Sequence, residues 1–598
     1  MTERRPIRIG NISGFYGDRL SAAREMVDGG ELDVITGDYL AELTLYILHK
    51  ARLKDPDAGY ATTFLRQMEE VLGSCLDRGI KVVVNAGGLN PAGLAARLRE
   101  LTGRLGLTAR IAQVSGDDVL AALPALQEAG HPLRHLDTGL ALADSAVEPI
   151  TANAYLGAWP IVTALEAGSD IVVTGRVTDA SLVVGPAAWW HGWREDDVDR
   201  LAGAVVAGHV IECGPQATGG NYSFFEEIGD PRYPGFPIAE VAADGSSVIT
   251  KHPGTGGLVS VGTVTAQLLY EIQGPDYGGP DVTTWFDSIR LEQQAQDRVR
   301  ISGTRGTPPT GRVKVAINYT GGYRNSMTMV ITGLDIEAKA AMARRMLFDS
   351  LGGEDSFDRV DVRLLRFDHA DAAVQAEAAA HLVVTVKDRD RAKVGRRFSN
   401  AVTELFLGGY PGFYTTTPPG SESAYGVYWP TLIPADAATA LVTFDDGSEH
   451  RVPSLPGAPD AAAVRPIPVP APPTPSEAVR ETAQLPLGTV VGARSGDKGG
   501  NANLGLWTRH DDEYAWLAGY LTVERLKELL PELGDLEVRR YELPNLRALN
   551  FVIVGILGEG VASSTRPDPQ AKALGEFARS RIVPIPVAIL PPEKTPAG

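Results

Sequence analysis

The sequence has few of the residues on which several classes of protein depend. Cys75 and Cys213 are the only cysteines among 598 residues, which excludes a disulfide framework and a zinc cluster built on cysteine. The ten histidines are scattered without the spacing of metal ligands, so we expect no metal site. No apolar run approaches the length of about 20 residues that spans a bilayer, and no signal-peptide core follows "MTERRPIRIG". We therefore expect a cytoplasmic protein with no membrane partner.

Clusters of basic residues are also absent. The chain has 74 acidic and 56 basic side chains, a formal net charge of -18, and these are spread without a basic run. Binding to a phosphate backbone needs such a run or patch, so we expect no nucleic-acid partner. A chain of this length, with 44% apolar residues, predicts a globular protein of roughly three or four domains.

The first 300 residues alternate short β-rich runs with helical runs. Examples are "IRIGNIS" before "DRLSAAREMVDGG", and "IKVVVNAG" before "NPAGLAARLREL". This alternation is typical of βαβ units, so residues 1–300 predict an α/β domain with a mostly parallel, Rossmann-like sheet. In such a sheet the turns that follow the strands lie along one edge, where ligands bind.

The pattern changes after residue 300. Residues 301–452 predict a two-layer α+β domain, in which two strands and a helix occur twice and "GGYRN" forms a turn in the first strand pair. Residues 453–484 are rich in proline and predict an extended linker. Residues 485–592 predict a small α+β domain. The apolar two-layer domain makes a homo-oligomer the expected state.

Two strand-to-helix turns of the first domain carry acidic residues. In "GNISGFYGDR" the glycines and the start of a helix suit an anion beside Asp18 and Arg19, and a tight turn capped by Asp18 is the alternative. In "ITGDYLAE" a helix that begins at Asp38 places Glu42 one turn away on the same face. Such a pair can divide acid and base roles, and a capping Asp38 with a solvated Glu42 is the alternative.

Two further turns supply amides, a hydroxyl and a guanidinium. "NAGGLNP" offers Asn85 and Asn90, and the amides of the "NAGG" loop with Gly87 and Gly88, to a carbonyl or carboxylate oxygen, and Pro91 fits the first position of a helix. The polar residues of "VVTGRVTDASL" directly follow a strand, and they include Thr174, Arg176 and Asp179. The planar guanidinium of the arginine suits a carboxylate or phosphate.

The stretch "GHVIECGPQATGGN" combines a histidine with a cysteine. As part of a helix, His209 and Cys213 lie on one face, and a thiol beside an imidazole can act as a nucleophile. The carboxyl end of a helix disfavours the thiolate, so we expect Cys213 to pack behind the site and His209 to act as acid or base. We expect the amides of Gln216 and Asn221 to face the substrate.

A loop near the C-terminal end is unusually polar. "ARSGDKGGNANLG" places Ser495, Asp497, Lys498, Asn501 and Asn503 among small residues between two strands. Backbone amides and a lysine point charge suit an oxyanion or a phosphorylated group, and an exposed hairpin is the alternative.

These motifs together resemble a known family. "IRIGNISGFYGDRLSAAREMVDGGELDVITGDYLAELTLYIL", "NAGGLNP", "TGRVTDASL" and "GHVIECGPQATGGN" are similar to the acyclic terpene utilization protein A family, AtuA. "ARSGDKGGNANLG" is similar to the small ferredoxin-like domain that accompanies it, and the resemblance covers roughly residues 5–450 and 485–592. The resemblance implies a role in the catabolism of acyclic terpenes and branched acyl chains.

We expect an enzyme that acts on a small carboxylate or an acyl-CoA thioester by lyase or hydratase chemistry. No nicotinamide or flavin motif is present, so we expect no redox cofactor, and coenzyme A enters only as part of a substrate. The expected catalytic residues are Asp38, Asp179, His209 and Lys498. The expected substrate-binding residues are Asp18, Arg19, Asn85, Gly87, Gly88, Thr174, Arg176, Gln216, Asn221, Ser495, Asp497 and Asn501. A non-catalytic subunit of an acyl-CoA-processing complex and a natural-product tailoring enzyme are the alternatives.

Overall fold

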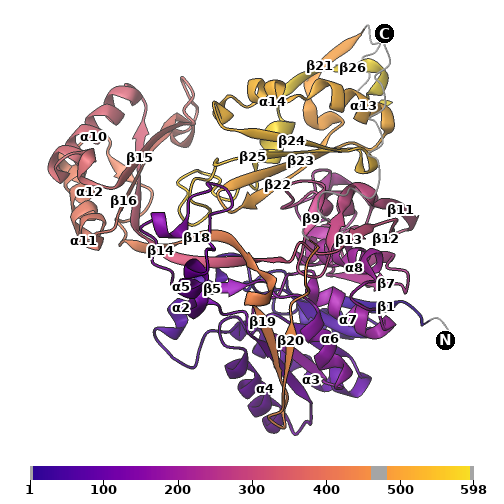
Figure 1. The fold of residues 1–598 in the computed structure, drawn as a ribbon. Coiled ribbons are helices and arrows are strands. Elements are labelled where there is room, and N and C mark those ends of the chain that lie inside the picture. The colour runs from indigo at the N-terminus through magenta and orange to yellow at the C-terminus, as the bar shows by residue number, and fades with distance from the viewer. Residues whose placement is uncertain (1–3, 459–480, 593–598) are drawn as a thin grey trace. The chain divides into compact units, whose positions relative to one another are not determined.

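The computed structural model describes residues 4–458 and 481–592 (Figure 1). The chain divides into two compact units. The first unit comprises Met1–Asn318, Tyr428–Val561 and Gln570–Gly598, and the second comprises Tyr319–Val427 and Ala562–Pro569. Most of the predicted linker, 453–484, lies outside the described residues.

The first unit contains an eleven-stranded mixed sheet. Its centre is parallel, in the order β1 (Ile7–Asn11), β2 (Val34–Gly37), β3 (Lys81–Val84), β6 (Ile171–Thr174) and β4 (Ile111–Ser115). Antiparallel strands extend it beyond β1 through β7 (Pro237–Val241), β8 (Ser247–Lys251), β12 (Arg298–Ser302) and β11 (Arg290–Ala295). Beyond β4 lie β19 (Thr439–Thr443) and β20 (Glu449–Pro453). The predicted parallel arrangement therefore forms the middle of a mixed sheet.

Helices connect these strands. They are α1 (Ala22–Asp28), α2 (Thr44–Arg52), α3 (Thr62–Arg78), α4 (Pro91–Leu105), α5 (Leu123–Glu128), α6 (Trp159–Glu166), α7 (Ser181–His191), α8 (Val198–Ile211) and α9 (Val261–Leu268). Short strands β5 (Thr151–Ala154), β9 (Asp276–Gly278), β10 (Thr283–Trp285) and β13 (Arg305–Thr307) complete this part. Helix α4 begins at Pro91 as predicted, and Asn90 Oδ1 caps it by accepting the Gly93 N–H at 2.8 Å.

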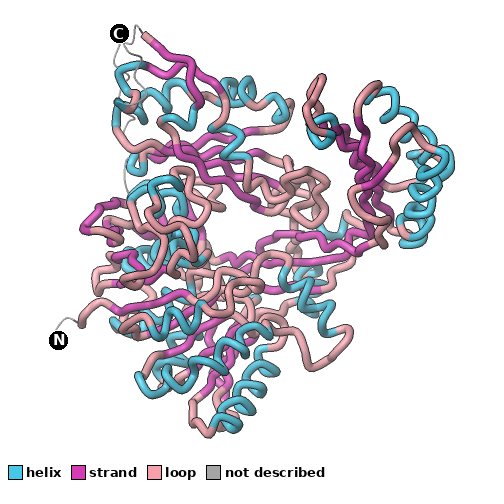
Figure 2. Tube along the Cα trace, turned by 180° about the vertical axis from the view of Figure 1, so that it is seen from behind, coloured by secondary structure: helices cyan, strands magenta, loops and turns pink. Residues whose placement is uncertain are grey.

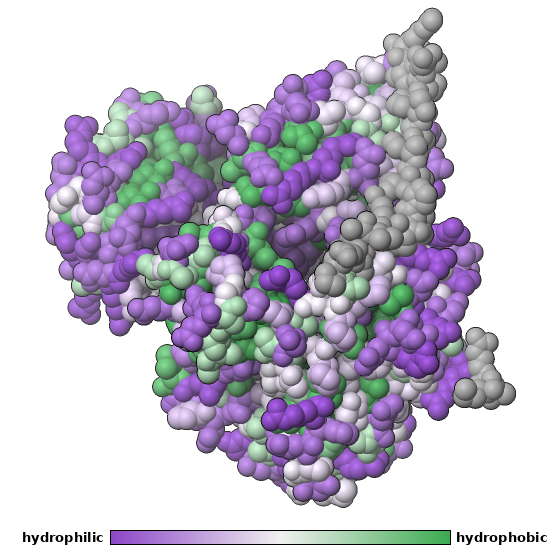
Figure 3. Space-filling view, viewed as in Figure 1, coloured by the Kyte–Doolittle hydropathy of each residue, from purple (hydrophilic) through white to green (hydrophobic). Residues whose placement is uncertain are grey.

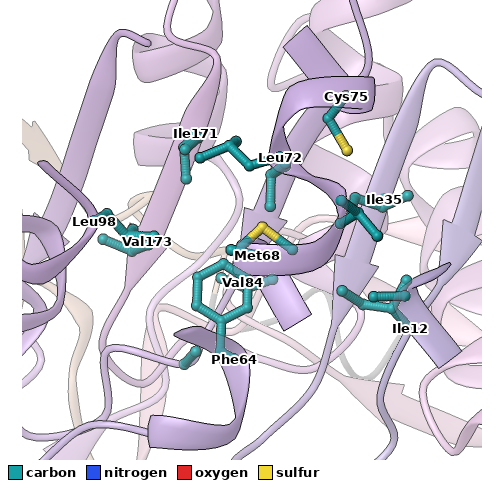
Figure 4. Packing of buried hydrophobic residues seen from close by; sticks show 14 of the residues in the cluster. Ile12, Ile35, Phe64, Met68, Leu72, Cys75, Val84, Leu98, Ile171 and Val173 are labelled. Carbon is teal, nitrogen blue, oxygen red and sulfur yellow. The ribbon is translucent and has the colours of Figure 1, made fainter. Parts of the chain in front are cut away.

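An apolar core joins α3 to the parallel strands. Figure 4 shows Phe64, Met68 and Leu72 of α3 close to Val84 of β3, and all four side chains are buried. Burying one such side chain contributes about 1.5–3 kcal/mol relative to leaving it exposed. Cys75 is buried in the same core, so this cysteine serves as an apolar packing residue.

The second unit is a sheet covered on one face by helices. Its strands are β14 (Arg312–Thr332), β15 (Arg359–Arg366), β16 (Ala379–Asp388), β17 (Tyr414–Thr415) and β18 (Ser423–Pro434), of which β14 and β18 also extend into the first unit. Its helices are α10 (Ile336–Leu351), α11 (Arg391–Val394) and α12 (Arg396–Gly408), which lie along the sheet in Figures 1 and 2. This unit is shorter than the predicted range 301–452, because β19 and β20 belong to the large sheet.

The predicted turn at "GGYRN" is wrong. Strand β14 runs without a break through these residues, because β5 pairs with it over Val315–Asn318 and β16 pairs with it from Tyr323 onward. Successive partners therefore satisfy the backbone on both sides of the glycines. Gly322 adopts a φ of +132°, which lets the strand change direction there without ending.

The last part of the first unit is the predicted small α+β domain. Its antiparallel sheet has the order β22 (Gly492–Lys498), β23 (Asn501–Trp507), β25 (Ala548–Ile553) and β24 (Val538–Leu543). The other elements are β21 (Thr482–Pro486), α13 (Asp511–Tyr520), α14 (Val523–Leu529), α15 (Leu574–Arg579) and β26 (Ile582–Pro586). Buried side chains such as Leu504, Leu517 and Phe551 form its core.

Hydrophilic residues cover much of the visible surface. The face drawn in Figure 3 is largely hydrophilic, with apolar residues in scattered patches. Across the described residues, every helix is too short or too polar to cross a lipid bilayer.

Candidate functional site

The loops that follow the parallel strands meet through direct hydrogen bonds. Asn85, after β3, donates from Nδ2 to Asp38 Oδ1, after β2, at 2.6 Å. Asn85 Oδ1 accepts the N–H of Tyr39 at 2.7 Å. Arg176, after β6, donates to the carbonyl of Leu40 at 2.7 Å. The predicted convergence of these turns on one edge of the sheet is therefore confirmed.

Arg176 is a buried cation with a partner. Its guanidinium is 4% exposed, lies 4.0 Å from the ring centroid of Tyr155 and donates to Asp179 Oδ1 at 2.8 Å. Burial lowers the pKa of Arg176, but the negative charge of Asp179 and further anionic neighbours raise it overall. Asp179 is 27% exposed, so this ion pair reaches the surface of the site.

Asp38 is buried and faces its own loop. Burial and repulsion from Asp179 raise the pKa of Asp38 well above its usual value, against the opposing effects of Arg176 and the Asn85 hydrogen bond. The prediction that a helix begins at Asp38 is wrong, since α2 begins at Thr44. Asp38 Oδ1 accepts the N–H of Leu40 at 3.0 Å and also the amide of Asn85, and these two hydrogen bonds fix a loop instead of a helical turn.

The β22–β23 hairpin brings Lys498 to this edge of the sheet. Glu42 Oε2 accepts the N–H of Gly499, in the turn of the hairpin, at 3.3 Å. Burial lowers the pKa of Lys498, but Tyr277, Glu271, Glu42 and Tyr155 raise it above its usual value, so the ammonium stays charged. Within the described part of the chain, this ammonium makes no hydrogen bond and no ion pair.

Asp497 lies next to this lysine in the chain. Burial first, and then the charges of Glu271 and Glu42, raise the pKa of Asp497 to about 7, against the opposing charge of Lys572. A carboxyl group with this pKa exchanges a proton readily at neutral pH.

These groups form what we call the polar cluster. Its members are linked by the hydrogen bonds above or by the electrostatic effects that shift their pKa values. They are Asp38, Glu42, Tyr155, Arg176, Asp179, Glu212, Cys213, Glu271, Tyr277, Arg494, Asp497 and Lys498. Catalytic candidates from both ends of the chain thus belong to one electrostatic network.

The sequence predicts that Cys213 packs behind the site and that His209 faces it, whereas the structure buries His209 and leaves Cys213 partly exposed. His209 is 1% exposed, its ring packs at 5.4 Å from Tyr277 and from Phe286, and its Nδ1 lies 3.3 Å from Glu212 Oε1. Cys213 is partly exposed, because α8 ends at Ile211 and the chain then turns out of the helix. His209 therefore reaches the polar cluster through Glu212.

The Cys213 thiol is poorly suited to nucleophilic attack. Burial, followed by the negative charges of Glu212, Glu271 and Asp38, raises the pKa of Cys213 well above its usual value. The thiolate is the reactive form, so this environment keeps the group in its less reactive state.

The predicted role of the "NAGG" backbone is wrong. The N–H of Gly87 donates to the carbonyl of Thr174 at 3.0 Å, and the N–H of Gly88 donates to the carbonyl of Asn85 at 3.2 Å. The first bond joins the loop to the end of β6 and the second lies within the loop, so neither N–H is left for a substrate oxygen. The Thr174 side chain is fully buried and donates to the Gly175 carbonyl at 2.9 Å.

Asp18 and Arg19 stabilise the first turn. Asp18 Oδ2 accepts the N–H of Gly14 at 2.8 Å, and Asp18 Oδ1 accepts the N–H of Arg19 at 2.7 Å. The Arg19 guanidinium pairs with Glu25 at 2.7 Å and lies over the ring of Phe236. These contacts fit the alternative prediction, a tight turn, better than an anion site.

The remaining predicted residues bind other parts of the protein. Gln216 Oε1 accepts from Arg494, and the exposed Asn221 has a left-handed backbone with a φ of +58°. Ser495 donates to the Ala571 carbonyl at 2.6 Å, inside the C-terminal domain.

Asn501 links the C-terminal domain to the α/β part of the first unit. Its Nδ2 donates to Asp137 Oδ1 at 2.7 Å, and its Oδ1 accepts the N–H of Gly555 at 2.9 Å. Both ends of this amide are therefore used in protein contacts.

Several members of the polar cluster were missed by sequence reasoning. Glu212 and Arg494 stand inside motifs that were singled out, but Tyr155, Glu271 and Tyr277 stand in segments without a motif. The one local signal is at Glu271, a charged residue directly after the apolar stretch that ends α9. Across residues 4–458 and 481–592, no three His, Cys, Asp or Glu side chains are grouped so that they could hold a metal ion.

The fold and the site define a class of protein. It is an α/β protein with a mixed sheet, in which a C-terminal α+β domain contributes a hairpin to the carboxyl edge of the parallel strands. The family model of the acyclic terpene utilisation family protein AtuA matches residues 7–444, and the model of the AtuA ferredoxin-like domain matches residues 485–583. The chain therefore belongs to the AtuA family, which relates it to terpene utilisation. Comparisons with curated proteins and with solved structures gave no match.

Proposed function

We propose that the protein is an enzyme of branched or terpenoid acyl catabolism that acts on a small carboxylate or an acyl-CoA thioester. The reaction is acid–base chemistry of the lyase or hydratase type, in which a proton moves at the carbon next to a carbonyl group. The observation that carries the proposal is the Lys498 ammonium, which is charged, partly buried and without a direct partner in the described residues. A buried cation of this kind favours negative charge that develops on a substrate oxygen.

The neighbours of Lys498 supply the proton transfer. Asp497, with a pKa of about 7, gives a proton to the carbon of the enolate, and the ammonium stabilises the enolate oxygen. In hydration, water forms a bond to the β-carbon as it loses a proton to a base, and the α-carbon takes a proton from the acid. The Arg176–Asp179 pair lies at the same edge, where its guanidinium is held in place to orient an anionic part of the substrate.

The test is turnover by the full-length protein. We expect the wild type to convert members of a panel of branched enoyl-CoA and hydroxyacyl-CoA thioesters and of the corresponding free acids, followed by mass spectrometry. Lys498→Met should lower kcat by roughly 10²–10³, the usual effect of removing one group that stabilises an oxyanion. Lys54→Met, at an exposed lysine before α3, is the matched control and should retain activity.

Two results would count against the proposal. If the wild type leaves the whole panel unchanged and co-purifies tightly with an acyl-CoA-processing enzyme, the chain is a non-catalytic subunit. If Lys498→Met turns over substrate as fast as the wild type, the ammonium has no role in the reaction.

A further inference from the structure

The turn between α9 and β9 is held by an asparagine of the C-terminal domain. Asn503 lies in β23, and its Oδ1 accepts the N–H of Glu271 at 2.9 Å. Its Nδ2 donates to the carbonyl of Leu269 at 2.7 Å. The side chain is buried, so both ends of one amide bind the same turn away from water.

A second asparagine continues this contact. Asn550 lies in the neighbouring strand β25, diagonally across from Asn503, and its Oδ1 accepts from Asn503 Nδ2 at 2.7 Å. Its Nδ2 donates to the carbonyls of Ile272 at 3.1 Å and Gln273 at 2.9 Å. Both N–H donors of each asparagine side chain are therefore used, and each amide oxygen accepts one hydrogen bond. We call Asn503 and Asn550 the asparagine pair.

The asparagine pair fixes an uncommon backbone conformation. Glu271 has a φ of +58°, in the left-handed region that residues other than glycine rarely adopt. Such a conformation persists where the surrounding structure holds it, and it occurs most often at functional sites. The hydrogen bonds on both sides of Glu271 supply that constraint.

The carboxylate of Glu271 acts electrostatically on several members of the polar cluster. Its negative charge raises the pKa values of Asp497, Cys213 and Lys498. It acts in the same direction on Glu212. The groups proposed to stabilise the oxyanion and to donate the proton are therefore electrostatic neighbours of this one carboxylate.

We propose that Glu271 is a catalytic carboxylate and that the asparagine pair are positioning residues that hold it beside Lys498. The C-terminal domain then builds the site in two ways, by supplying Asp497 and Lys498 and by fixing Glu271. The catalytic part rests on the proposed function. In hydration, Glu271 takes the proton from water as the water oxygen bonds to the β-carbon, the double-bond electrons move to the enolate, and Asp497 protonates the α-carbon.

The first measurement is steady-state turnover. Glu271→Gln and Glu271→Asn remove the carboxylate, and asparagine tolerates the left-handed backbone, so the second variant should fold. We expect kcat to fall by roughly 10²–10⁴ with little change in KM, and one limb of the pH profile to disappear, as for the loss of a general base. Asn503→Ala and Asn550→Ala should lower kcat less, without removing the limb.

Asn545→Ala is the matched control. Asn545 also joins the C-terminal domain to the rest of the first unit, through hydrogen bonds to the carbonyls of Phe286 and Ile289, both at 2.9 Å. Its loss should lower the melting temperature as much as the loss of Asn503, while kcat stays close to the wild-type value.

A second measurement does not depend on turnover. Iodoacetamide alkylation of Cys213, mapped by mass spectrometry against the buried Cys75, reports the charge near the thiol. Glu271→Gln should lower the pH at which alkylation is half-maximal, and the rate at pH 8 should rise about tenfold if that midpoint falls by about 1. Asn503→Ala and Asn550→Ala should move the midpoint in the same direction, and Asn545→Ala should not.

The outcomes separate the two proposals. If the wild type converts substrate and Glu271→Gln does too, Glu271 is not catalytic, although the proposed function stands. If the wild type converts nothing but alkylation responds as expected, the asparagine pair positions Glu271 and the proposed reaction fails, together with the catalytic role. If alkylation is unchanged in all variants, the positioning is overturned.

Discussion

Asn85 donates a 2.6 Å hydrogen bond to Asp38 and so joins the loops after β3 and β2. The same amide accepts the N–H of Tyr39, so Asn85→Ala removes one of the two hydrogen bonds to the buried Asp38 carboxyl and leaves the buried N–H of Tyr39 without its partner. We expect the free energy of unfolding to fall by about 2–4 kcal/mol, measured by chemical denaturation. Asn90→Ala removes the cap of α4 and two hydrogen bonds from Asn90 Nδ2 to the carbonyls of Asp57 and Ala58. Asn90 is partly exposed, so this variant should cost only about 1 kcal/mol, and equal losses in the two variants would contradict this account.

Activity should depend on the protonation of Asp497. Because this carboxyl has a pKa of about 7 and is proposed to donate a proton, kcat/KM should fall as the pH rises through about 7. Asp497→Asn should abolish this limb and lower kcat. A wild-type profile that is flat between pH 6 and about 8 would argue against Asp497 as the acid.

Two carboxyl groups outside the polar cluster should make stability depend on pH. Burial is the main cause that raises the pKa values of Asp117 and Asp281 to about 6. Their pKa values are higher in the folded state than in the unfolded chain, so the folded state binds more protons and stability falls as pH rises from about 4 to 6.

Asp281→Asn isolates one of these contributions. Asp281 accepts the N–H of Ala158 at 3.0 Å, which an asparagine oxygen can also do. The variant should gain stability relative to the wild type as pH rises from 4 to about 7, by up to about 3 kcal/mol. The two proteins are compared by urea denaturation at each pH, and a constant difference between them would refute the prediction.

Cys213 and His209 should respond differently to substitution. Cys213→Ser should retain activity, because the raised pKa of the thiol keeps it protonated and leaves it no nucleophilic role. His209→Ala should lower both stability and turnover, because the buried ring packs on Tyr277 and Phe286 and contacts Glu212. Loss of activity in Cys213→Ser with retention in His209→Ala would restore a nucleophilic cysteine.

The local pattern of the sequence was enough to predict the centre of the large sheet. Alternating strands and helices predict parallel strands. The loops after parallel strands lie at one edge of the sheet, which places Asp38, Asn85 and Arg176 there. The start of α4 at Pro91 follows from the same kind of local preference. These features depend on residues close to each other in the chain.

Other features depend on contacts between distant segments. Helix α2 begins at Thr44 and not at Asp38, because Asn85, from the loop after another strand, donates a hydrogen bond to Asp38. Glu271 carries no recognisable motif, and its place is fixed by Asn503 and Asn550, more than two hundred residues away. Single-sequence patterns contain no information on such pairings, because the hydrogen bonds form only after the two domains have packed.

Strand β14 has a consequence for how the protein can change during evolution. Its first half pairs with β5 and its second half pairs with β16, so the number of residues between the two halves sets which side chains face which way along the sheet. One residue inserted between Asn318 and Tyr323 would turn Met327, Met329 and Ile331 out of the core that they form with α10 and α12. Chain length is therefore fixed across Tyr319–Gly322, a segment that sequence patterns alone would mark as a loop open to insertions.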